Sequence, residues 1–167
     1  MKRIKANCPV AIRDEGLVRF HDGKYEEAFD HYSKAAELGD IEAHYHLARL
    51  YMRGEGVEKD QRKHRKHAET AAIGGHPGAR FFLYEWEMDD GNSDRAIKHL
   101  VIAAKQGLEL AIDFLKKRYT NGDGAVSKEV FAEALRGYQA ALDLMKSPQR
   151  DAAERFSANR LGFNGFN

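Results

Sequence analysis

Histidines offer the clearest chemistry in this chain, because an imidazole can ligate a metal or carry a proton near neutral pH. The chain contains 8 of them. His64 and His67 are three positions apart and share one helical face, whereas His44 and His46 are two apart and do not. No carboxylate stands in a known zinc-binding spacing beside them. The sequence therefore predicts no bound metal, and we expect surface or partly buried histidines that titrate close to neutral pH.

Two further motifs resemble metal sites but lack ligands. Residues 121–127 (Asn-Gly-Asp-Gly-Ala-Val-Ser) imitate a calcium loop, yet the first and last ligand positions hold Tyr119 and Val130. Cys8 begins a Cys-Pro-x-Cys pattern in which Ala11 replaces the second thiol. We expect a structural Gly-x-Gly turn in the first case and no cofactor in either. Because Cys8 is the only cysteine, an intramolecular disulfide is excluded, which favours a reducing compartment.

A basic segment, Lys59–His67, carries side chains that could contact phosphates. It has no interleaved aromatic residues, and acidic residues follow in the next hairpin, between Glu85 and Asp94. We therefore expect the charges of neighbouring helices to balance one another. Binding of RNA or DNA is the alternative function, and its candidate residues are Lys59, Arg62, Lys63 and Lys66.

The composition bounds the architecture that must position these side chains. The chain has 167 residues, a formal net charge of +1 and 43% hydrophobic residues, which fits one domain or a short repeat array. Frequent alanine and only 3 prolines favour helices over strands. Residues 1–15 lack the apolar run of a secretory signal, and no segment is apolar enough to span a membrane, so we expect a soluble cytoplasmic protein.

No catalytic residues are predicted. A nucleophile, a base and an orienting group cannot be assembled from sequence neighbours, although such groups can meet in space from distant positions. We therefore expect a protein that is not an enzyme. A hydrolase is the third hypothesis, and it requires a deep pocket that holds a residue with a strongly shifted pKa.

An internal repeat is the strongest pattern in the sequence. The pairs Ala35–Ala36, Ala71–Ala72 and Ala103–Ala104 recur in phase, and each is followed by a glycine and another alanine. Each unit reads as two helices and a tight turn. Small residues on facing helices allow the helices to approach closely, so we expect these pairs to form the seams between stacked hairpins. Large apolar residues fill the space beside them, among them Leu47, Leu83 and Leu115.

Capping residues predict where the helices begin and end. Asp40 is a helix N-cap before Ile41–Arg53, and the helix Asp60–Ile73 ends at Gly74–Gly75, which suits a left-handed turn. A long helix is expected over Lys128–Met145. The expected domains are a structural or disordered N-terminal segment (1–12), a repeat array (13–146), a capping helix that follows the Ser147–Pro148 start signal (147–160) and a disordered tail (161–167).

The repeat pattern resembles the Sel1-like repeat family, whose members are related to tetratricopeptide repeats. The most specific stretch is the loop Gly-Glu-Gly-Val-Glu-Lys-Asp at 54–60, and the resemblance covers residues 16–141. One departure is His64, which stands where other units have Ala28 and Ala96. The resemblance implies an all-α fold, a right-handed α-solenoid of about four helix-turn-helix repeats plus a C-terminal helix. It also implies a non-enzymatic adaptor or scaffold that binds proteins and shares no catalytic residues.

The same resemblance implies that the first helix of each repeat lines a concave face. Residues between the core positions of these helices then form rungs that a protein segment or peptide can cross. Phe82 and Phe114 are either anchors for that partner or core residues. We expect neither nucleic acid nor a membrane as the partner, and copies of the chain could associate through the repeat ends. The candidate concave-face residues are His44, His46, Arg49, Arg80, Phe82, Glu85, Phe114 and Lys117, with Ile112 on the first rung.

Overall fold

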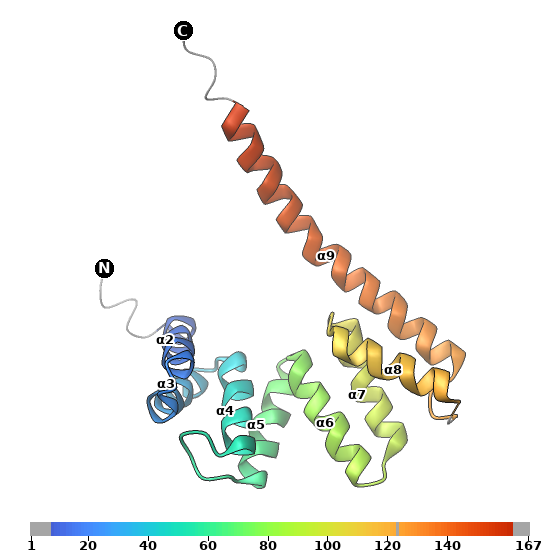
Figure 1. The fold of residues 1–167 in the computed structure, drawn as a ribbon, viewed down its shortest axis with the longest axis horizontal. Coiled ribbons are helices and arrows are strands. Elements are labelled where there is room, and N and C mark those ends of the chain that lie inside the picture. Colours follow the sequence, from blue (N-terminus) through green and yellow to red (C-terminus); the bar gives the residue numbers. More distant parts are fainter. Residues whose placement is uncertain (1–7, 123, 162–167) are drawn as a thin grey trace.

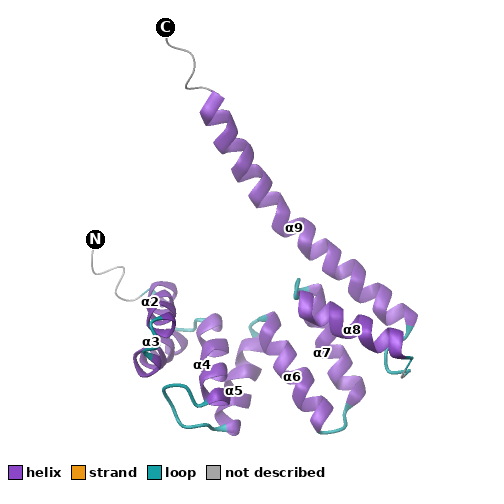
Figure 2. Cartoon of the chain, in the orientation of Figure 1, coloured by secondary structure: helices purple, strands orange, loops and turns teal. Residues whose placement is uncertain are grey.

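The computed structural model describes residues 8–122 and 124–161, and over these residues the chain forms α-helices and loops without strands (Figure 2). The all-α prediction is confirmed. The helices are α2 (Pro9–His21), α3 (Tyr25–Glu37), α4 (Ile41–Arg53), α5 (Gln61–Ile73), α6 (Pro77–Asp89), α7 (Ser93–Lys105), α8 (Glu109–Asn121) and α9 (Lys128–Leu161).

The helices stack as consecutive hairpins in a curved row (Figure 1). The main contacts within hairpins join α2 to α3, α4 to α5 and α6 to α7, and each hairpin also packs against the next. The helix α9 packs against both α7 and α8 and then continues beyond the row. Because each hairpin buries its apolar face against its neighbours, the architecture is the α-solenoid that the repeats predicted.

The predicted caps fix several helix ends. An Oδ of Asp40 accepts the backbone N–H of Ala43 at 2.7 Å and starts α4 at Ile41, as predicted. Asp60 does the same for α5, which begins one residue later than predicted. Gly56 has a φ of 69°, and a Cβ there would collide with the backbone of Tyr25, so the 54–60 loop needs glycine at this position.

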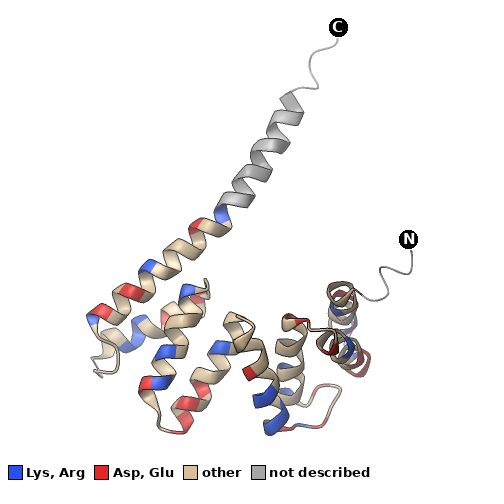
Figure 3. Ribbon diagram, turned by 180° about the vertical axis from the view of Figure 1, so that it is seen from behind, with Lys and Arg blue, Asp and Glu red and all other residues tan. Residues whose placement is uncertain are grey.

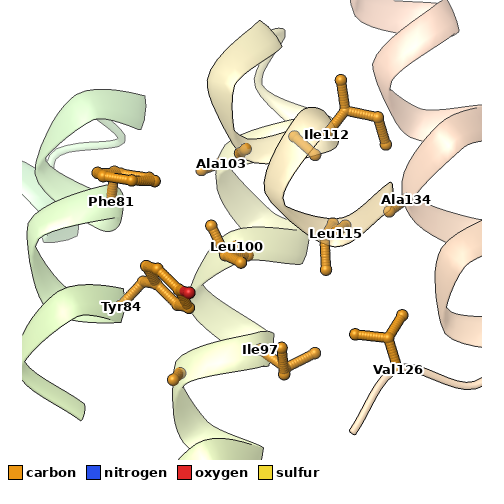
Figure 4. Packing of buried hydrophobic residues seen from close by; sticks show 12 residues of the cluster. Phe81, Tyr84, Ile97, Leu100, Ala103, Ile112, Leu115, Val126 and Ala134 are labelled. Atoms are coloured by element: carbon orange, nitrogen blue, oxygen red, sulfur yellow. The ribbon is translucent and has the colours of Figure 1, made fainter. Parts of the chain in front are cut away.

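The alanine pairs are buried at the helix contacts, as the sequence predicted. Ala35, Ala71 and Ala72 are 0% exposed, and so are the two alanines of the third pair. Larger side chains fill the remaining space, and Figure 4 shows Leu100 and Leu115 within the cluster that joins α6, α7, α8 and α9. The small side chains let neighbouring helices approach, while the large ones supply most of the buried apolar area.

Both predicted boundaries of the repeat array differ from the structure. The N-terminal helix α2 already begins at Pro9, because a proline suits the first helical position. Residues 9–12 of the predicted N-terminal segment therefore belong to the array, and residues 1–7 lie outside the described residues.

At the other end, α9 is one helix through Ser147 and Pro148, so a separate capping helix at 147–160 is wrong. A proline removes one backbone donor but does not reverse the chain. The earlier hairpins turn at glycines with positive φ, and no glycine stands between Met145 and Gln149. The predicted tail, apart from Leu161, lies outside the described residues.

Candidate functional site

A groove of about 410 Å³ crosses the first helices of successive hairpins. Its walls come from α4, the start of α5, α6 and α8. Aromatic rings and two carboxylates dominate the lining. The lining residues are Met52, Gln61, His64, Phe82, Tyr84, Glu85, Trp86, Met88, Asp89 and Phe114.

Phe82 and Phe114 are both half-buried, so neither is a fully buried core residue and neither is fully exposed. The ring of Phe82 stacks on Tyr45 with 5.6 Å between centroids. Phe114 contacts Phe81 and Tyr84 edge-on, at 5.1 and 5.8 Å. Each phenylalanine therefore packs against the protein on one side and contributes to the groove on the other.

His64 links the aromatic wall to the backbone of α4. Its side chain is only 4% exposed, and its Nδ1 lies 2.9 Å from the carbonyl oxygen of Ala48. A carbonyl oxygen only accepts, so Nδ1 carries the proton and Nε2 is left as an acceptor. The ring also lies 4.4 Å from that of Trp86. Burial lowers the pKa of His64, which keeps the imidazole neutral.

Glu85 and Asp89 place two carboxylates on one side of α6. They are four positions apart, and neither forms an ion pair with any residue that the structure describes. The acidic neighbours differ, because Glu87 lies 3.6 Å from Arg95 and Asp90 lies 3.8 Å from Arg65. Burial, and then the charge of Asp89, raises the pKa of Glu85.

Four of the predicted site residues lie together at this groove. Phe82, Glu85 and Phe114 line it, and the Lys117 ammonium lies 5.7 Å from the centre of the Phe114 ring. The arrangement brings side chains from α6 and α8 to one surface. Whether they bind a partner remains a prediction.

The other predicted residues do not line the groove. His44 meets His67 of α5, with 2.9 Å between their Nδ1 atoms, and His46 stacks on Tyr32 of α3 at 4.6 Å. The guanidinium of Arg49 lies over two aromatic rings, those of Phe20 and Tyr45. Arg80 is half-buried, and its Nε has no hydrogen-bond partner among the described residues. Ile112 is buried in the core. Side chains at matching repeat positions therefore serve different contacts, because their neighbours differ between repeats.

Trp86, Asp89 and His64 were missed as site residues by the sequence interpretation. A signal existed in the helical spacing, because positions 82, 85, 86 and 89 fall on one face of a helix. His64 was considered as a possible metal ligand beside His67 and as a departure from alanine, but not as a groove residue. Its place in the groove depends on Phe82 and Trp86, whose rings contact the imidazole only in the folded chain.

The candidate nucleic-acid residues Lys59, Arg62, Lys63 and Lys66 are exposed, and Figure 3 shows basic residues, in blue, gathered at the start of α5. The expected charge balance occurs at Arg65, which pairs with Glu69 of α5 and with Asp90, the residue that follows α6. No comparison supports nucleic-acid binding.

A larger hollow of about 510 Å³ lies between α7 and α9 and is lined by Ile97, Val101 and Val130 among others. It contains none of the predicted site residues. Within the described residues no three His, Cys, Asp or Glu side chains are grouped to hold a metal, and no helix there is long and apolar enough to cross a membrane.

Comparison with known proteins places the repeats in a family. The model described as Sel1 repeat matches residues 16–40, 41–76 and 89–108. No curated protein gives a significant match.

Two solved structures share the fold at a TM-score of 0.65. A Sel1 repeat protein from Oxalobacter formigenes is 26% identical over 83% of this chain. The protein c5321, a protective antigen of uropathogenic Escherichia coli with an SLR fold, is 27% identical over 86%. The chain spans 59% and 32% of the lengths of these two proteins.

Proposed function

We propose that this Sel1 repeat protein is a non-enzymatic adaptor that binds a segment of another protein in the groove across α4, α6 and α8. The supporting observation is the groove itself, in which half-buried aromatic rings from two successive repeats face one surface. Aromatic side chains contribute strongly to protein interfaces, because they bury much area with few rotatable bonds. Sel1 repeats are generally scaffolds for protein interactions, which agrees with this role.

The chemistry of the lining supports binding rather than catalysis. No serine, threonine, cysteine or lysine is among the residues that line the groove. The histidine there, His64, uses Nδ1 to hold the carbonyl oxygen of Ala48, not to orient against a carboxylate. The lining therefore offers no serine, threonine, cysteine or lysine nucleophile for a base to activate.

A peptide-display selection against the complete folded chain tests the proposal. Trp86 is the only tryptophan, so its fluorescence reports peptides that enter the groove. We expect selected peptides to change that fluorescence and to bind Phe114→Ala at least about tenfold more weakly, the loss expected for an interface anchor.

The matched control is Ile102→Ala, which truncates an exposed apolar side chain of the other hollow and should leave peptide affinity unchanged. Circular dichroism checks that both variants are folded. Failure to select any peptide, or equal binding of selected peptides to Phe114→Ala and the unmodified chain, would contradict the proposal.

A further inference from the structure

Within the described residues, no basic side chain forms an ion pair with Glu85 or Asp89, the acidic wall of the groove. Glu85 and Asp89 are i,i+4 neighbours on α6, a spacing at which like charges repel each other. Arg65 of α5, which lies over the Trp86 ring, is engaged by Glu69 at 3.1 Å and by Asp90 at 3.8 Å. A cation from a bound partner would therefore relieve the repulsion between the two free carboxylates.

The same groove contains a hydrogen-bond acceptor, the Nε2 atom of His64. His64 is 4% exposed and lines the groove, and its Nδ1 proton is committed to the carbonyl of Ala48. No described residue donates to its Nε2. Because an acceptor that loses water without gaining a donor is costly, the groove favours a ligand group that donates hydrogen bonds.

The aromatic rings add a preference for a flat cation. At the edges of the groove, the guanidinium carbon of Arg65 lies 5.6 Å from the centre of the Trp86 ring, and Lys117 lies 5.7 Å from that of Phe114. Both rings therefore already attract cations of this chain, and both also line the groove that a partner would enter. A planar guanidinium can lie against such a ring and keep its edge free for carboxylates.

We propose that the groove recognises an arginine side chain of the bound segment, with Glu85 and Asp89 as the acceptors for its guanidinium, His64 as a further acceptor and Trp86 as a stacking surface. This inference rests on the proposed function and names the chemistry of its partner. Arginine fits better than lysine, because its guanidinium carries five donors in a planar fork and gives up its hydration more readily than an ammonium.

Two blocked peptides that differ in one group test the inference. Acetyl-Leu-Arg-Leu-amide is titrated into the full chain and followed by Trp86 fluorescence, beside the same peptide with citrulline, which keeps the shape but not the charge. We expect the citrulline peptide to bind at least about tenfold more weakly. Replacing both carboxylates, Glu85→Gln with Asp89→Asn, should remove that difference. The control Glu37→Gln changes one exposed carboxylate on α3 and should preserve it.

The outcomes separate this inference from the proposed function. Equal affinity for the arginine and citrulline peptides, or an arginine preference that survives loss of both carboxylates, overturns arginine recognition. If displayed peptides still bind through Phe114 in that case, the binding function stands and only the identity of the recognised group is wrong. If neither the blocked peptides nor any displayed peptide enters the groove, both proposals fail.

Discussion

Acidification should destabilise the fold through partly buried histidines around α4. Burial lowers the pKa of His46 from its ordinary value of 6.5 to about 4, and Arg49, His76 and Arg13 add to the effect, while Glu42 opposes it. The pKa of His67 is also lowered to about 4, first by burial and then by His44, whose Nδ1 lies 2.9 Å from its own. Folding therefore favours the neutral form of both imidazoles.

The sign and size of the effect follow from this shift. A pKa that is lower in the folded state gives stability that is complete above pH 6.5 and is lost as the pH falls towards 4. At pH 5 the two histidines are mostly protonated in the unfolded chain and mostly neutral in the folded chain. This difference lowers the free energy of unfolding by about 2 kcal/mol for each histidine. A loss of about 4 kcal/mol is a large fraction of the stability of an ordinary domain.

Urea unfolding at pH 7, 6 and 5, followed by circular dichroism, measures this loss. The variant His46→Phe keeps a ring against Tyr32 but does not titrate, so it should lose about 2 kcal/mol less than the unmodified chain between pH 7 and pH 5. The control His21→Phe, at an exposed position, should retain the full pH dependence. An identical pH dependence in His46→Phe and the unmodified chain would refute the reasoning.

Three stability changes can be measured by the same urea titrations. Leu100→Ala should cost about 2–5 kcal/mol because it leaves a cavity in the core, whereas Leu144→Ala, at a side chain that is 74% exposed, should cost little. Gly56→Ala should lower the free energy of unfolding more than Gly91→Ala does. Both glycines have positive φ, but only at position 56 would the added Cβ collide with backbone atoms, so equal losses would contradict this account of the loop. Ala71→Leu should destabilise by about 1–3 kcal/mol through overpacking of a helix seam, and an unchanged midpoint would show that the seam has room.

The site was only partly predictable from the sequence. Position in the repeat selected Phe82, Glu85 and Phe114 correctly as neighbours at one surface, because equivalent positions on stacked helices lie side by side. It failed for His46 and Arg49, which have the same phase but cover Tyr32, Phe20 and other rings. Side-chain size and the neighbours in adjacent repeats decide which way such residues point.

The sequence by itself determined the helices, the order of the hairpins and the seams between them. These features depend on local signals, such as the carboxylate of Asp40 at a helix start and alanines that recur at a fixed phase. The tertiary structure alone decided that α9 continues past Pro148 and that His64, Trp86 and Asp89 share a groove. Those outcomes depend on contacts between residues far apart in the chain, whose energies no local pattern records.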